Sequence, residues 1–368
     1  MPEDTDREQS EAAVAANREL FARFRSRLDY EQVYDVGAPE EGEIPRVLYH
    51  YTTVAGLSGI ISSKSFWASS VRYMNDASET TYAEALIHRV VSKKLAASAY
   101  PWILERIPIR EGFANPYEFG LSPFIVCFCE DPDLLSQWRA YGVGTAGVSI
   151  GIDIRTLDPY RGWPANSVLA KVCYDSEQQV RRVEDRVERW LGRLQSLISD
   201  GMNEKHENIF WHAASTSLRE ALADLFLTFK DPAFREENEW RLIKLIDLRE
   251  ELRLAAEKRS DEQIRAAHDA ARVTLPDWPE PPRIDRPQSY AEGLDIRFRP
   301  SAMGLIPYVE IPLVCHTGNF SGRLPLVEVV HGPSSHREIS FESLRLFLEV
   351  HGYGAFTEVR DSMIPLRR

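Results

Sequence analysis

The stretch Leu48-Tyr49-His50-Tyr51-Thr52 predicts a short strand that ends in polar side chains. A helix should follow at once, because apolar residues recur every three or four positions through 54–61. A second short strand is expected at Phe66-Trp67-Ala68, and the loop Arg72-Tyr73-Met74-Asn75-Asp76 should lead into another helix. Packing alone requires neither a strand-end histidine nor the polar pairs of that loop. We therefore predict that this stretch forms one half of a binding cleft, which residues 236–241 complete.

The composition predicts a soluble chain with a sizeable core. With 368 residues, 43 % hydrophobic residues and eight tryptophans, it can form one large domain or two ordinary ones. A net charge of −12 argues against broad binding to nucleic acids or acidic membranes, which requires a basic surface, although a local basic groove stays open. No apolar run reaches the roughly 18 residues of a membrane span. The acidic N-terminus lacks the features of a signal peptide, so a cytoplasmic location without membrane contact is expected.

Familiar catalytic motifs are absent from the sequence. The four cysteines show no zinc-binding spacing, and Cys127 and Cys129 should share one face of a buried strand in a reducing compartment. There is no phosphate-binding loop and no serine nucleophile elbow. The glycines of 142–147 precede a strand rather than open a helix, and His206 and His212 lack the spacing of a zinc helix. No metal site is predicted.

Strands and helices are predicted to alternate irregularly. Strands are expected at 124–128, 147–152, 168–174, 239–247, 295–299, 308–313, 327–331 and 355–359, and helices at 12–30, 76–97, 177–197, 208–229, 249–272 and 336–350. Because the order lacks the regular rhythm of a doubly wound sheet, we predict an α+β fold with a mixed or antiparallel sheet core. Residues 1–45 would form an N-terminal helix and linker, and 46–368 one domain with helical insertions at about 176–230 and 249–285.

Two polar clusters come from the first half of the predicted cleft. His50 lies among Tyr49, Tyr51 and Thr52, where it is either a ligand-binding residue or a hydrogen-bonded edge histidine. The group Tyr73, Asn75, Asp76 and Glu79 either lines a site or caps a helix, since Asn-Asp followed by a glutamate is a capping pattern.

Two further clusters come from later in the chain. Segment 136–141, Ser-Gln-Trp-Arg-Ala-Tyr, offers several groups that donate hydrogen bonds or stack, unless its tryptophan simply belongs to the core. Glu237 and Glu239 are two positions apart at the start of a strand, so both can face the same side. Paired carboxylates repel each other, which would raise a pKa, but a charged edge strand explains such a pair equally well.

Several of these motifs together resemble a known protein family. They are Leu-Tyr-His-Tyr-Thr, Phe-Trp-Ala-Ser, Met-Asn-Asp with Glu79, Cys-Phe-Cys-Glu with Leu-Leu-Ser-Gln-Trp-Arg-Ala-Tyr-Gly, Phe-Arg-Glu-Glu-Asn-Glu-Trp-Arg-Leu, Tyr-Val-Glu-Ile-Pro-Leu from Tyr308, and His-Gly-Pro from His331. In this order they are similar to the mainly bacterial domain-of-unknown-function family 2971. The similarity covers roughly 47–365, interrupted by the helical insertions.

The strand-borne histidine and late glutamate of this family resemble the His-Tyr-Glu constellation of ADP-ribosyltransferases, which implies an enzyme that consumes NAD. Cleavage of the nicotinamide–ribose bond develops an oxocarbenium-like ribose, as glycoside hydrolysis does. Glu239 would stabilise this positive charge, and Glu237 would orient the acceptor. His50 would bind a ribose hydroxyl. The other implied NAD contacts are Tyr73 or Tyr51 on nicotinamide with Ser69 competing for that place, Arg72 or Arg139 on the pyrophosphate, and Thr52 and Asn75.

Three functions stay open on the sequence. The first is an NAD-consuming transferase that modifies a protein or nucleic acid, as a toxin or in phage defence. The second is a metal-dependent, nuclease-like effector. The third is a non-catalytic sensor or binding module in which His50 and Glu239 hold the cleft closed. The two long helices, which we expect to be amphipathic with solvated Arg and Glu, are a candidate homodimer interface.

Overall fold

The computed structural model describes most of the chain. The described residues are 16–24, 26–28, 44–74, 77–110, 112–141, 147–156, 167–200, 207–248, 296–301, 304–315, 320–334, 336–365 and a few isolated positions within 253–269. The predicted helix at 249–272 and the insertion to 285 therefore lie outside the continuous described ranges, as do Asn75 and Asp76. Within the described part, no helix combines the length and the apolar character needed to cross a membrane.

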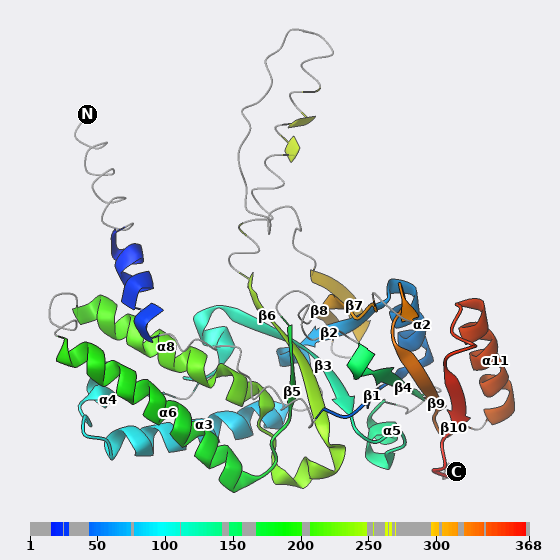
Figure 1. Cartoon of the computed structure of the whole chain (residues 1–368), viewed down its shortest axis with the longest axis horizontal. Helices are drawn as coiled ribbons and strands as arrows, with labels where there is room; N and C mark the ends of the chain where they lie inside the picture. Colours follow the sequence, from blue (N-terminus) through cyan, green and yellow to red (C-terminus); the bar gives the residue numbers. More distant parts are fainter. Residues whose placement is uncertain are drawn as a thin grey trace.

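A single mixed sheet runs through the middle of the molecule (Figure 1). Its strands are β1 Val47–Thr53, β2 Ser65–Ser70, β3 Leu121–Cys129, β4 Gly147–Asp153, β5 Ser167–Lys171, β6 Glu239–Asp247, β7 Ile296–Ser301, β8 Gly304–Pro312, β9 Leu326–His331 and β10 Glu358–Asp361. The order is β10-β9-β4-β1-β3-β2-β8-β7, with β6 on β3 and β5 on β6. The β9–β10 pair is parallel, whereas the other described pairs are antiparallel. The predicted combination of a mixed sheet with helices is confirmed.

The sheet forks at β3, and this fork positions the candidate site. One edge of β3 pairs with β6 along its whole length, from Leu121 opposite Asp247 to Cys129 opposite Glu239. The other edge must therefore carry both β1 and β2. β2 pairs at the start of that edge, opposite Phe124 and Ile125, and β1 pairs only at Cys129. None of the described strands pairs with the stretch 126–128 on that edge.

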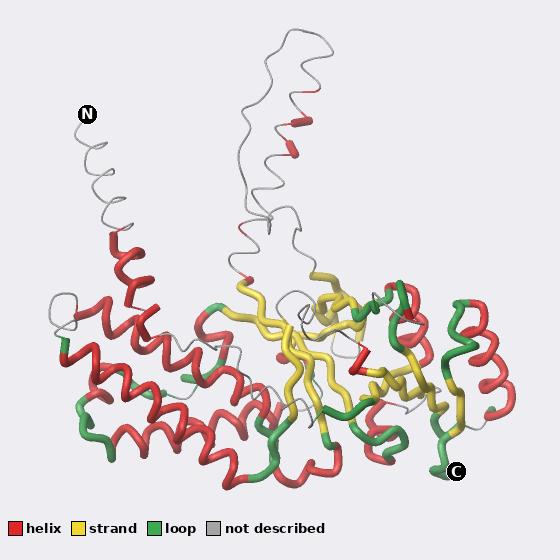
Figure 2. Tube along the Cα trace, in the orientation of Figure 1, coloured by secondary structure: helices red, strands yellow, loops and turns green. Residues whose placement is uncertain are grey.

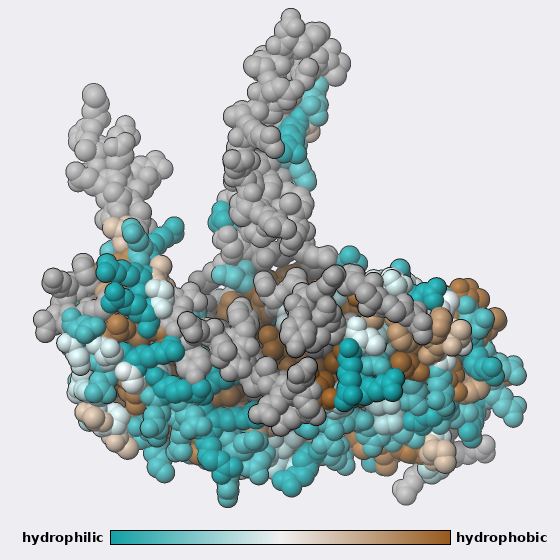
Figure 3. Space-filling model, viewed as in Figure 1, coloured by the Kyte–Doolittle hydropathy of each residue, from teal (hydrophilic) through white to brown (hydrophobic). Residues whose placement is uncertain are grey.

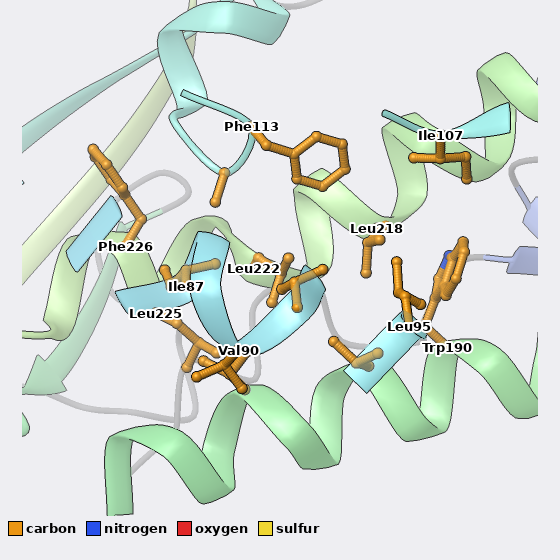
Figure 4. Packing of buried hydrophobic residues seen from close by; sticks show 14 of the residues in the cluster. Ile87, Val90, Leu95, Ile107, Phe113, Trp190, Leu218, Leu222, Leu225 and Phe226 are labelled. Atoms are coloured by element: carbon orange, nitrogen blue, oxygen red, sulfur yellow. The ribbon is translucent and has the colours of Figure 1, made fainter. Parts of the chain in front are cut away.

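Helices gather against one face of the sheet (Figure 2). They include α3 Ala77–Ala96, α4 Ile103–Arg106, α6 Ser176–Ser199 and α8 Glu207–Thr228, and they share one apolar cluster with the β3, β5 and β6 residues Ile125, Ala170 and Ile243. Figure 4 shows the helix side chains that fill this cluster, among them Ile87, Val90, Leu95, Trp190, Leu218, Leu222 and Leu225. The helical residues near the N-terminus add to it, because Phe24 and Leu28 are buried there.

The expected amphipathic character holds for α6 but not for α8. Fifteen of the 22 residues of α8 are buried, including Glu220 and Asp224. Asp224 pairs with Arg186 of α6 in a buried ion pair of 3.0 Å rather than in a solvated one. The sequence reasoning failed here because α8 contacts α3 and α6 together, so that it buries more than one stripe.

The opposite face of the sheet carries a second apolar core. Helices α2 Val54–Ser63 and α11 Arg337–Val350 cover it, with buried residues such as Leu57 and Leu348. The outer face of α11 leaves Ile339, Leu346 and Val350 exposed, and brown atoms mark this region at the right of Figure 3. The last strand was predicted three residues too early, since β10 begins at Glu358 after a turn that contains Gly354.

Candidate functional site

Glu239 is the first residue of β6, and the turn before it determines its position. The 3-10 helix η5, Pro232–Glu237, ends at Asn238, whose left-handed backbone has φ +40° and ψ +51°. Asparagine is one of the few side chains that adopt this conformation readily. The turn allows both Glu237, outside the strand, and Glu239, inside it, to reach the ammonium group of Lys230.

Four charged side chains form a compact cluster at this end of β6. The Arg241 guanidinium donates from Nε to Oε1 and from Nη2 to Oε2 of Glu239, both at 2.9 Å. Lys230 Nζ donates to Glu239 at 3.2 Å and to Glu237 at 2.5 Å. The side chains of Glu239, Arg241 and Lys230 are at most 7 % exposed, whereas that of Glu237 is 18 % exposed. The cluster therefore balances two negative charges with two positive ones.

The cluster sets the protonation of Glu239. Burial alone would raise the pKa of its carboxyl, but the charges of Arg241 and Lys230 and hydrogen bonds from Arg241 and the Cys127 thiol outweigh it and lower the pKa to about 2. The expectation that the two neighbouring glutamates raise a pKa is therefore wrong for Glu239. Lys230 contacts both carboxylates and offsets their repulsion, and nothing in the local sequence around the glutamates indicates this contact.

Two tyrosines adjoin the cluster. The Tyr174 hydroxyl accepts a hydrogen bond from the Glu239 backbone N–H at 3.2 Å. Burial, with the charge of Glu239 next in size, raises the pKa of Tyr174. The pKa of Tyr141, at the end of α5 Leu135–Tyr141, is also raised, first by burial and then by the charges of Cys127, Glu239 and Glu237. Both phenols are therefore neutral hydrogen-bonding groups around physiological pH.

His50 fills the gap at the fork of the sheet. Its Nδ1 lies 2.9 Å from the carbonyl oxygen of Cys127, which has no β1 or β2 partner. Because a carbonyl can only accept, Nδ1 carries the proton and Nε2 of the neutral ring is an acceptor. The ring contacts Phe66 and Phe128 with centroids 5.3 and 5.9 Å away. Burial lowers the pKa of His50 to about 4, so the imidazole is neutral at pH 7.

Cys127 therefore connects the two residues that the sequence singled out. Its backbone carbonyl bonds to His50 of β1, and its thiol donates to Glu239 of β6. His50 and Glu239 come from strands far apart in the sequence, and β3 lies between them (Figure 1). The sequence reasoning treated Cys127 only as a small strand residue and missed this connecting position.

The predicted nicotinamide contacts occupy different environments. Tyr51 is buried, and its hydroxyl donates to the Asp131 carbonyl at 2.8 Å and accepts from the Leu134 N–H at 2.7 Å. Tyr73, at the end of the 3-10 helix Val71–Tyr73, is exposed. Ser69 Oγ accepts a hydrogen bond of 2.9 Å from Arg299. The nicotinamide role stays a prediction for all three, and the structure gives Tyr51 a packing role of its own.

The remaining predicted NAD contacts are spread around the fork. The Arg72 guanidinium stacks on the Tyr117 ring at 4.0 Å, and Arg139 is exposed on α5. Thr52 lies against Gly56, where an added Cβ would meet its hydroxyl at 2.1 Å. Asn75 falls outside the described residues. Among the residues that the structure describes, no three His, Cys, Asp or Glu side chains are grouped as metal ligands.

One comparison with known proteins gives a match. Residues 137–242 match the family described as "Protein of unknown function (DUF2971)". The resemblance to family 2971 is confirmed over these residues, and the predicted similarity of the rest of 47–365 stays a prediction. The DUF2971 segment begins in α5 and ends in β6, so it contains the whole charge cluster of Lys230, Glu237, Glu239 and Arg241. Neither the curated proteins nor the solved structures include a significant match to this chain.

Proposed function

We propose that the chain is an NAD-dependent, ADP-ribosyltransferase-like enzyme that modifies a protein or a nucleic acid, as an effector of the toxin or phage-defence type. The observation that carries the proposal is the meeting of His50 and Glu239 around Cys127 at the fork of the sheet. The ADP-ribosyltransferase constellation requires a strand-borne histidine and a later glutamate, and both strands flank β3 here.

The protonation states fit this chemistry. A carboxylate that stabilises an oxocarbenium-like ribose must be ionised, and Glu239, with a pKa of about 2, is ionised at neutral pH. A histidine that holds a ribose hydroxyl must offer an acceptor or a donor, and neutral His50 offers Nε2 as an acceptor. NAD would supply the bond that breaks, and these residues would bind and orient its ribose.

The hydrogen bonds of Glu239 limit how a ribose hydroxyl could reach its carboxylate. A carboxylate has about four acceptor positions, and Glu239 receives two bonds from Arg241, one from Lys230 and one from the Cys127 thiol. A ribose hydroxyl must therefore replace one of these donors. The thiol is the weakest of them, so we expect the hydroxyl to take the place of Cys127.

Because all acceptor positions of Glu239 are occupied, a second candidate function is also favoured, the non-catalytic binding module. In that case Arg241 and Lys230 hold Glu239 as a structural counter-ion, and the fork binds a ligand without transforming it. The two candidates differ in one measurable property: only the enzyme releases nicotinamide.

The test is nicotinamide release from NAD by the purified protein, with and without cell lysate as a source of acceptor. His50→Ala and Glu239→Gln should abolish release, and a chelator should have no effect. Asp224→Asn is the matched control, because it changes another buried, arginine-paired carboxylate in the helical layer. The Asp224→Asn variant should still release nicotinamide. Binding of NAD without release by the folded protein would favour the binding module, and release that both site variants retain would refute the proposed roles.

A further inference from the structure

Two buried N–H donors near the fork have no acceptor among the residues that the structure describes. They are Nε1 of Trp67 on β2 and Nε of Arg299 on β7. A donor withdrawn from water without an acceptor bears the full desolvation cost of the group, so native proteins contain few of them. Such a pair in one region indicates that a bound group supplies the acceptors.

Both donors lie on one face of the strands β2, β8 and β7. Trp67 and Ser69 are two positions apart on β2 and therefore share a face. The Trp67 ring lies 5.1 Å from that of Tyr308 on β8, and Arg299 Nη2 donates to Ser69 Oγ at 2.9 Å. Tyr308 lies opposite Ser69 in the β2–β8 pair, so it adjoins the residue that Arg299 contacts.

Arg299 and Arg297 lie on the same strand but have different charged surroundings. Arg297 on the same strand pairs with Glu310 at 2.7 Å and is half-exposed. The described groups that act on Arg299 are the phenols of Tyr308 and Tyr141, rather than a carboxylate, and burial lowers its pKa. A partly buried guanidinium without a carboxylate is an anion-binding group, because its planar set of donors matches phosphate oxygens.

The position of Arg299 connects this face to the proposed active site. Arg299 bonds to Ser69, which lies opposite Ile125 of β3, two residues before the Cys127 whose carbonyl binds His50. Arg299 also interacts electrostatically with Tyr141, and the charge of Glu239 contributes to raising the pKa of Tyr141 after burial and Cys127. The two unpaired donors therefore lie beside the fork that holds His50 and Glu239.

We propose that Arg299 and Trp67 bind the phosphate oxygens of the ligand, with the Arg299 guanidinium as the charged contact and the Trp67 indole N–H as a neutral one. The inference rests on the proposed function, for which it assigns the diphosphate of the dinucleotide. It replaces Arg72 and Arg139 in that role, because Arg72 is stacked on Tyr117 and Arg139 lies exposed on α5.

The test measures the Kd of NAD, ADP-ribose, inorganic pyrophosphate and nicotinamide riboside by calorimetry. For Arg299→Gln, we expect the three diphosphates to bind about 10- to 100-fold more weakly, as for a lost charged hydrogen bond. Nicotinamide riboside, which lacks phosphate, should bind unchanged. Trp67→Phe keeps the ring against Tyr308 and should weaken the diphosphates about 3- to 10-fold. Arg297→Gln, on the same strand, should leave every Kd within about twofold.

The outcomes separate this inference from the proposed function. Pyrophosphate binding that depends on Arg299, without NAD binding, would support the phosphate site and refute the NAD-dependent function. NAD binding that Arg299→Gln and Trp67→Phe leave unchanged would overturn the phosphate site alone. Absence of binding of either ligand to the folded protein would overturn both. Arg299→Lys, which keeps the charge, should retain part of the affinity and so shows that a loss in Arg299→Gln reflects charge rather than misfolding.

Discussion

Glu239→Gln should destabilise the protein by about 3 kcal/mol at pH 7, and the loss should vanish in acid. The pKa of Glu239 falls from 4.5 to about 2 on folding, and each pH unit corresponds to about 1.4 kcal/mol. The same magnitude follows from the ion pairs, since removing one partner of a buried pair costs roughly 3–5 kcal/mol. Arg241 and Lys230 would keep their charges while losing the carboxylate that both contact.

The pH dependence distinguishes this mechanism from a packing defect. Between pH 2 and pH 4.5 the folded protein holds Glu239 ionised while the unfolded chain binds the proton, so the contribution of Glu239 to stability rises with pH in this window. Below pH 2 a protonated glutamic acid is neutral and nearly isosteric with glutamine. The difference in unfolding free energy between wild type and variant should therefore shrink from about 3 kcal/mol above pH 5 to near zero at pH 2.

The assay is urea unfolding at a series of pH values, followed by fluorescence. Asp224 provides the contrast, because burial raises its pKa to about 6 despite the opposing charge of Arg186. Between 3.8 and about 6 its folded form holds the proton that the unfolded chain releases, so its contribution falls as pH rises. A Glu239→Gln defect of the same size at pH 7 and pH 3 would refute the electrostatic reasoning.

Two further predictions concern the tyrosines and the histidine of β1. His50 should titrate near pH 4, because burial lowers its pKa. In a pH series of histidine NMR spectra, one imidazole signal should still have the chemical shift of a neutral ring at pH 5. That signal should be missing in His50→Ala. Tyr51→Phe should cost about 1–3 kcal/mol of unfolding free energy, because the Leu134 N–H and the Asp131 carbonyl both lose their partner. The exposed Tyr73→Phe is its control and should change the free energy by less than about 0.5 kcal/mol, and equal effects of the two changes would contradict the packing role of Tyr51.

Local patterns predicted most of the elements because they depend on neighbouring residues only. The strand at 239–247 was predicted at its observed bounds from its mixture of apolar and charged residues, with Trp240, Leu242 and Leu245 among Arg241, Lys244 and Asp247. The same kind of pattern failed for α8, where two helices and the sheet bury charged residues as well as apolar ones. A periodic apolar pattern identifies one buried face of a helix, but it does not show how many other elements pack against that helix.

The site was predicted only as far as single stretches reveal it. His50 and the glutamates stand out in their own segments, but Lys230 and Arg299 look like ordinary surface cations in theirs. Lys230 matters because it lies two residues after the end of α8 and contacts both Glu237 and Glu239. Arg299 matters because β8 pairs with both β2 and β7. Such partners depend on strand order and register, which no local pattern encodes.

The fork of the sheet explains why β1 carries a half-buried histidine at this position. An unbranched sheet would satisfy the Cys127 carbonyl with a backbone N–H, but β1 and β2 diverge there and leave the carbonyl to a side chain. An aliphatic residue at position 50 would leave that carbonyl unpaired, at a cost of about 1–3 kcal/mol. The stability of the fold therefore explains the hydrogen bond made by Nδ1 of His50, but it gives no reason for the acceptor at Nε2. The case for function rests on the groups that structure does not need: Nε2 of His50 and the N–H donors of Trp67 and Arg299, which have no partner among the described residues.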